Sequence, residues 1–135
     1  MAPNARMADV SADDLNGQTA LLVEDDALVG ISLKGSLEEL GASVVWATRL
    51  ASALEAVQSG TPIDIAIVDI NLAGEVSTPV LDILVTRGTY TIICTGYDDS
   101  NLETRFLELP RCEKPFTRAK IRRYIWLARK TNWQT

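Results

Sequence analysis

The sequence contains few cysteines and no long apolar run. Its two cysteines, Cys94 and Cys112, are too few for a disulfide framework and are not spaced as metal ligands. Each lies in an apolar, strand-like run, so we predict two buried free thiols in a reducing cytoplasm. No stretch of about 18 apolar residues occurs, which excludes a membrane span. Residues 1–17 also lack the apolar centre of a signal peptide.

Basic residues are scarce over most of the chain. Residues 1–110 contain five Lys and Arg against 17 acids, whereas residues 111–135 contain eight against one acid. The net charge is −5, so most of the surface repels nucleic acid and only the last helix attracts it. Because that helix carries no motif for reading bases, we expect no nucleic acid partner.

The chain has room for a single domain. Residues 1–17 are polar and lack apolar periodicity, which predicts a flexible leader. Residues 18–135 form the expected domain, because 47% of the 135 residues are apolar and can fill one core of ordinary size.

From residue 19 onward, strand and helix patterns alternate. Short apolar runs predict strands at 19–24, 43–47, 63–68, 89–95 and 110–113. Apolar residues spaced by three or four predict the helices between and after them: Val29, Leu33, Leu37 and Leu40; Leu50, Leu54 and Val57; Val80, Leu81 and Leu84; Leu102, Phe106 and Leu109; Ile121, Ile125 and Ala128. Five such units predict an α/β fold, a five-stranded parallel sheet with helices on both faces.

Polar residues that can take part in chemistry follow four of the predicted strands. They are the acidic trio Glu24-Asp25-Asp26, then Asp69, Thr95 and Lys114. The carboxyl ends of parallel strands share one edge of the sheet, so we expect these side chains to converge there. Carboxylates suit a hard cation such as Mg²⁺, and a hydroxyl and a lysine suit phosphoryl oxygens.

Each of these residues also has an ordinary structural explanation. The acidic trio can cap the helix that follows it and stabilise its dipole. Asp69 can start a turn, and Thr95 can be a common strand residue. Lys114 can be a surface lysine before a turn proline. Singly the residues leave these alternatives open, whereas their order along the chain favours a shared site.

Taken together, these residues resemble the CheY-like receiver domain of two-component response regulators, over roughly residues 19–130. The segment Asp69-Ile70-Asn71-Leu72-Ala73-Gly74 matches the family's loop after the phosphorylated aspartate, and Lys114-Pro115-Phe116 matches its ending. The resemblance implies a flavodoxin-like (βα)5 three-layer sandwich with strand order 2-1-3-4-5. It also implies that Asp69 accepts the phosphoryl group, aided by Thr95 and Lys114.

The metal site comes from the same resemblance. It implies that Glu24, Asp25, Asp69 and the backbone carbonyl of Asn71 bind Mg²⁺, with Asp26 as the helix cap.

Departures from the usual receiver pattern concern the conformational switch. Arg111 stands where most receivers have an aromatic residue, and Gly96-Tyr97 follows Thr95. These features resemble the "FAT GUY" subset of alphaproteobacterial receivers, which implies a role in signalling and stress responses. We expect Tyr97 to act as the switch, with a static lid as the alternative, and the bond before Pro115 to be cis as in the family.

The last helix combines basic and aromatic residues on its outer face. They are Arg122, Arg123, Trp126, Arg129, Lys130 and Trp133. Because Trp and Arg are enriched at interface hot spots, we predict a docking surface for a partner protein. A solvated basic face is the alternative.

The resemblance implies a cytoplasmic single-domain response regulator. It would receive its phosphoryl group from a histidine kinase or a phosphotransfer protein, and signal by protein contact or drain phosphoryl groups. It would be no enzyme, apart from autophosphorylation by small phosphodonors and slow self-dephosphorylation. One alternative is a haloacid dehalogenase-like phosphohydrolase, whose second Asp is replaced here by Asn71. The other is a phosphate-independent binding module.

Overall fold

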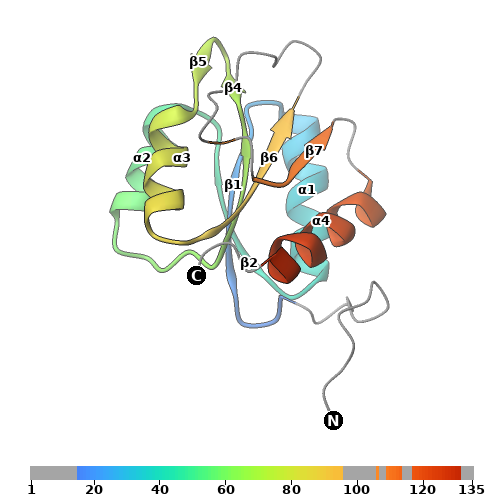
Figure 1. Ribbon diagram of the computed structural model, residues 1–135. Helices are drawn as coiled ribbons and strands as arrows, with labels where there is room; N and C mark the ends of the chain where they lie inside the picture. Colours follow the sequence, from blue (N-terminus) through green and yellow to red (C-terminus); the bar gives the residue numbers. More distant parts are fainter. Residues whose placement is uncertain (1–14, 96–105, 107–108, 114–116, 132–135) are drawn as a thin grey trace.

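The computed structural model describes residues 15–95, 106, 109–113 and 117–131, with only the backbone of residues 95 and 128–131 (Figure 1). The elements in chain order are β1 (Thr19–Val23), α1 (Ala27–Glu39), β2 (Ser43–Ala47), α2 (Leu50–Gln58), β3 (Ile65–Asp69), β4 (Asn71–Leu72), β5 (Glu75–Val76), α3 (Thr78–Thr86), β6 (Tyr90–Thr95), β7 (Arg111–Glu113) and α4 (Arg118–Thr131).

Four parallel pairings join five strands into one sheet in the order β2-β1-β3-β6-β7. Since β6 and β7 are its fourth and fifth strands, the predicted order 2-1-3-4-5 is confirmed. Helices α1 and α4 cover one face, and α2 and α3 cover the other (Figure 1). Side chains of each strand alternate between the two faces: Leu22 and Ile67 belong to the α1/α4 core, whereas Leu21 and Val68 belong to the α2/α3 core.

Local signals in the sequence start and end the helices. The Asp26 carboxylate accepts a hydrogen bond of 3.0 Å from the Val29 N–H and caps α1. Thr117 caps α4 in the same way, because its hydroxyl accepts from the Lys120 N–H at 3.1 Å. Beyond the ends of α1 and α3, Gly41 and Gly88 adopt positive φ of 101° and 74°, a conformation that glycine allows at little cost.

The structure differs from the sequence prediction at the start of the domain. Leu15 is fully buried in the α1/α4 core, and its N–H donates to the Leu40 carbonyl at 2.8 Å. The prediction of a flexible leader over residues 1–17 is therefore wrong for residues 15–17, which belong to the folded domain. Residues 1–14 lie outside the described part of the chain.

A two-stranded hairpin, β4–β5, follows β3 and was not predicted. Its two turn residues, Ala73 and Gly74, both adopt positive φ, of 51° and 93°. That geometry is the two-residue turn that matches strand twist, and it is normally marked by Asn-Gly or Asp-Gly rather than Ala-Gly. The sequence therefore lacks the usual hairpin signal.

Three further sequence predictions concern the helix over 102–109, the two cysteines and the lack of a membrane span. The helix expected over 102–109 lies outside the described residues except for Phe106 and Leu109, which are buried in the α2/α3 core. Cys94 and Cys112 are free and buried, as predicted. Among the described residues, no helix is both long and apolar enough to cross a membrane.

Candidate functional site

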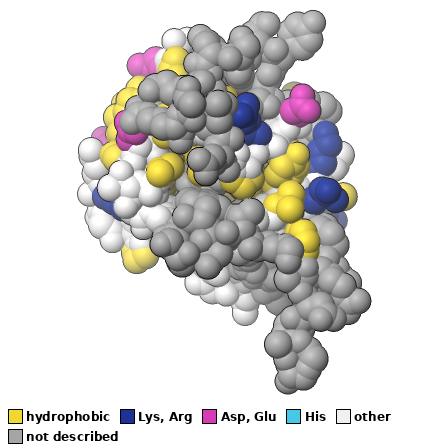
Figure 2. Space-filling view, viewed as in Figure 1, with side chains coloured by type: hydrophobic (Ala, Val, Ile, Leu, Met, Phe, Trp, Pro, Cys, Tyr) yellow, Lys and Arg dark blue, Asp and Glu magenta, His cyan; other side chains and the backbone are white. Residues whose placement is uncertain are grey.

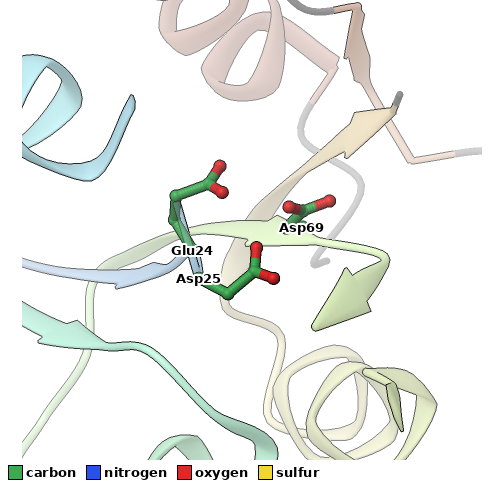
Figure 3. Close-up of side chains that lie close together, drawn as sticks. All are labelled: Glu24, Asp25 and Asp69. Carbon is green, nitrogen blue, oxygen red and sulfur yellow. The ribbon is translucent and has the colours of Figure 1, made fainter. Parts of the chain in front are cut away.

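Three carboxylates converge at the carboxyl edge of the sheet. Glu24 and Asp25 follow β1, and Asp69 is the last residue of β3, the neighbouring strand (Figure 3). One carboxylate oxygen from each residue lies within 4.8 Å of those of the other two. The predicted convergence is thus present for these residues, because strands β1 and β3 run parallel and end side by side.

The three acids differ in exposure. Glu24 and Asp69 are 1% and 3% exposed, whereas Asp25 is exposed to solvent. Buried carboxylates of like charge are costly unless a cation or hydrogen bonds offset them. Because all three donors are oxygens and one is open to solvent, the cluster fits a hard divalent cation that keeps several waters, as Mg²⁺ does.

Two hydrogen bonds restrain the loop from 24 to 26. The Asp26 N–H donates to the Glu24 carboxylate at 3.1 Å, and the Glu24 N–H donates to the Ala47 carbonyl at 3.0 Å. Two members of the acidic trio, Glu24 and Asp25, therefore belong to the site, whereas the third, Asp26, caps the N-terminus of α1.

The hairpin β4–β5 lies against the same site. The Asp25 carboxylate accepts a hydrogen bond of 2.9 Å from the Ala73 N–H, and the Asn71 side-chain oxygen accepts one of 3.1 Å from the Gly74 N–H. Thus the β1 loop and the turn after β3 are joined directly. The Asn71 side chain stabilises the turn.

The backbone carbonyl of Asn71 is directed away from the hairpin. The Ser77 N–H donates to the Ile70 carbonyl at 2.8 Å, so these two residues form a hydrogen-bonded pair. Hydrogen-bonded and non-hydrogen-bonded pairs alternate along an antiparallel ladder, and the next pair is Asn71 with Val76. The Asn71 carbonyl is therefore not used within the hairpin.

Of the other predicted site residues, Arg111 is described, whereas the rest lie partly or wholly outside the described part of the chain. Thr95 ends β6, beside Cys94, which pairs with Asp69; only its backbone is described. Arg111 begins β7 opposite Ile93 and is partly exposed. Lys114, Pro115, Gly96 and Tyr97 lie outside the described residues.

The last helix is described in part. Ile121 and Ile125 are fully buried, as the predicted inward stripe requires. Arg123 is exposed, whereas Arg122 and Trp126 are half-buried and so only partly available at the surface. The side chain of Lys130 and all of Trp133 lie outside the described residues. On the right-hand side of Figure 2, where Figure 1 places α1 and α4, Lys and Arg side chains lie beside apolar ones.

Sequence reasoning missed two residues that support the site, Trp46 and Ala73. The indole N–H of Trp46 donates to the backbone carbonyl of Glu24, and the N–H of Ala73 donates to Asp25. A tryptophan in an edge strand and an alanine in a loop carry no sequence signal for such contacts. The two glycines of α1, Gly30 and Gly35, look alike in the sequence, although only a Cβ at Gly30 would meet another side chain, that of Trp46.

Comparisons with known proteins agree with this geometry. A match to the family described as "Response regulator receiver domain" covers residues 20–125. The solution structure of SdrG from Sphingomonas melonis Fr1 is similar, with 35% identity, 82% of this chain and 95% of that chain covered, and a TM-score of 0.74.

Two further solved structures are similar. The receiver domain of the response regulator PhyR from Erythrobacter litoralis has 27% identity, coverage of 85% and 92%, and a TM-score of 0.73. A response regulator receiver protein from Sinorhizobium medicae WSM419 shares the fold at 22% identity, with coverage of 85% and 96% and a TM-score of 0.73.

Proposed function

The chain belongs to the response regulator receiver family of two-component systems, and from that premise we propose that Asp69 accepts the phosphoryl group. The observation that carries the proposal is the position of this carboxylate. Asp69 is 3% exposed at the end of a central strand, within 4.8 Å of two further acids. A carboxylate so placed can act as a nucleophile where a cation offsets the charge gathered around it.

The proposed reaction moves a phosphoryl group from a phosphohistidine of a kinase or phosphotransfer protein to Asp69. A carboxylate oxygen attacks phosphorus, the P–N bond breaks, and its electron pair stays on the imidazole. The product is an acyl phosphate. When bound, Mg²⁺ would supply charge neutralisation at the phosphoryl oxygens.

The chain offers groups for each part of this reaction. Glu24, Asp25 and the carbonyl of Asn71 are the proposed cation ligands, together with Asp69; the assignment is supported by the three gathered carboxylates and by a carbonyl that the hairpin ladder leaves unused. Thr95 and Lys114 are the proposed partners of the phosphoryl oxygens, on the strength of the family match alone.

A hydrolase mechanism of the haloacid dehalogenase type is the less favoured candidate. It requires an acid or base two residues after the nucleophile, where this chain has Asn71. A side-chain amide does not ionise near neutral pH and so cannot act as a general acid or base, and the Asn71 oxygen already accepts a hydrogen bond from Gly74. We therefore expect slow self-dephosphorylation and no turnover of phosphomonoesters.

The proposal is tested with acetyl phosphate as the phosphodonor. Purified protein is incubated with acetyl phosphate and Mg²⁺, and its intact mass is measured. We expect one added phosphoryl group, which is absent in Asp69→Asn and absent when Mg²⁺ is chelated. Asp26→Asn is the matched control, because it removes a neighbouring charge while asparagine still caps α1.

Two results would contradict the proposal. Labelling of Asp69→Asn to the wild-type level would place the phosphoryl group elsewhere. No labelling of the wild type by acetyl phosphate or by phosphorylated histidine phosphotransfer proteins would instead favour the phosphate-independent binding module.

The proposed signalling partners are proteins, and a cytoplasmic location follows from this proposal. Besides the basic, aromatic outer face of α4, two apolar side chains of α1 support a protein contact close to the site. Leu28 and Ile31 are 81% and 60% exposed, although both are large and apolar. The phosphorylated domain would signal through such contacts or drain phosphoryl groups.

Tyr97 is the proposed conformational switch, and the chain is proposed to belong to the FAT GUY subset of receivers. Its test compares amide chemical shifts with and without beryllofluoride, a phosphoryl mimic, in wild type and Tyr97→Ala. Identical shift changes on β7 and equal partner binding in both proteins would eliminate Tyr97 as the switch.

A further inference from the structure

Trp46 connects the edge strand β2 to the acidic loop. Its indole N–H donates a hydrogen bond of 2.9 Å to the backbone carbonyl of Glu24. The side chain is half-buried and packs against the α1/α4 core, as those of Val44 and Val29 do. The indole therefore has two contacts: an apolar one with the core and a polar one with the first acid of the site.

The contact depends on a glycine in the facing helix. Gly30 is buried in α1, and a Cβ built there would overlap Cζ2 of Trp46 and lie 2.5 Å from Cε2 and 2.8 Å from Cη2. Cε2 is bonded to the indole nitrogen, so the ring edge over Gly30 is the edge whose N–H reaches Glu24. Any larger residue at position 30 must displace that edge.

The hydrogen bond acts on two acids at once. The carbonyl of Glu24 and the N–H of Asp25 belong to one planar peptide unit, so holding the carbonyl restrains the backbone of both residues. The Glu24 N–H is held in turn by the carbonyl of Ala47, the residue after Trp46. Consecutive residues of β2 thus bind the backbone of Glu24 on both sides.

We propose that Trp46, seated on Gly30, is a positioning residue that preorganises Glu24 and Asp25 for the divalent cation. This inference rests on the proposed function, because it concerns the cation that phosphoryl transfer at Asp69 would use. Groups that orient ligands raise affinity by reducing the ordering needed on binding. Loss of the hydrogen bond from Trp46 should therefore weaken cation binding, although no cation ligand is changed.

Trp46→Phe and Gly30→Ala test the two halves of the contact. Phenylalanine retains an apolar ring but has no N–H, and alanine at position 30 displaces the indole. The chain offers a matched control for each. Gly35 lies in the same helix, and a Cβ there would meet nothing within 4 Å, so Gly35→Ala controls for helix propensity. Trp126→Phe controls for loss of a half-buried indole elsewhere.

Two measurements are made on the full chain. The first is amide hydrogen exchange of the metal-free protein. The Asp26 N–H donates to the Glu24 carboxylate, so it should exchange faster in Trp46→Phe and Gly30→Ala, where Glu24 is less restrained, than in either control. The second is Mg²⁺ affinity by calorimetry. We expect about threefold to tenfold weaker binding in the two test variants, the ratio that one ordinary hydrogen bond contributes, and wild-type affinity in both controls.

The possible outcomes distinguish the positioning role of Trp46 from the proposed cation-dependent phosphoryl transfer at Asp69. If the wild type binds Mg²⁺ and Trp46→Phe binds it equally well, with Asp26 exchanging as in the wild type, Trp46 is a packing residue and the proposal is overturned. The same holds if urea stability falls but affinity does not. If the wild type binds no Mg²⁺, the proposed function fails. In that case the positioning role of Trp46 is still tested by amide exchange, and an Asp26 exchange rate in Trp46→Phe equal to that of the wild type would refute it.

Discussion

The carboxylate of Asp25 accepts a hydrogen bond of 2.9 Å from the backbone N–H of Ala73, 48 residues along the chain. Ala73 has a φ of 51°, a left-handed conformation that costs an alanine about 1–2 kcal/mol. The hydrogen bond offsets part of that cost and joins the loop after β1 to the turn after β3. Asp25 is therefore both an acid of the site and a structural acceptor.

These two roles predict different stabilities for two substitutions of Asp25. Asp25→Asn removes a charge from a cluster of three acids and keeps an oxygen for Ala73, so the metal-free protein should become more stable. Asp25→Ala relieves the same repulsion but loses the acceptor, and should be less stable than Asp25→Asn by about 0.5–1.5 kcal/mol. Urea unfolding in EDTA measures both. Equal stabilities of the two variants would show that the Ala73 contact contributes nothing.

The turn residues form a second matched pair. Ala73→Gly removes the left-handed penalty and should raise the free energy of unfolding by about 0.5–1 kcal/mol, after the added freedom of the unfolded chain is counted. Gly74→Ala places a side chain at φ 93° and should lower it by about 1 kcal/mol or more. Urea denaturation at fixed pH checks both signs. A stabilising Gly74→Ala would contradict the turn geometry.

Stability at high pH depends on Cys112. Burial raises the pKa of this thiol from 9.0 to about 11. Between these values the unfolded chain loses the proton and the folded protein keeps it, so the stabilising contribution is complete below pH 9 and lost as the pH rises towards 11.

Cys112→Ala should be less stable than the wild type at neutral pH, because a cavity forms. The difference between their free energies of unfolding should become smaller as the pH rises from 9 towards 11. The comparison cancels the other groups that titrate there. A difference that stays constant with pH would mean that Cys112 ionises equally well in both states.

Most of the sheet could be predicted from the sequence because four of its five strands are short, mainly apolar runs; the exception is β7, Arg111-Cys112-Glu113. The expected run 63–68 became β3 (Ile65–Asp69), and its last residue is the acid that the pattern singled out. The same edge rule predicted that Glu24, Asp25 and Asp69 would meet. Both results follow from parallel topology, which periodicity reveals well.

What the sequence did not reveal depends on single contacts. The β4–β5 hairpin turns through Ala73, a residue that rarely takes positive φ, so the composition of the loop did not indicate it. Leu15 follows two aspartates in a polar stretch, and its burial against α1 depends on tertiary packing. The Trp46 contact with Glu24 depends on the facing Gly30, a relation between elements that no local pattern contains.

The central claim is that Asp69 carries the phosphoryl group, and reduction of the acyl phosphate tests it most directly. Protein treated with acetyl phosphate and Mg²⁺ is reduced with borohydride, which converts a phosphorylated aspartate to homoserine and releases phosphate. Peptide mass spectrometry then locates the homoserine. We predict homoserine at position 69 and unmodified aspartate at positions 25 and 26. Homoserine at another aspartate, with Asp69 unmodified, would contradict the account.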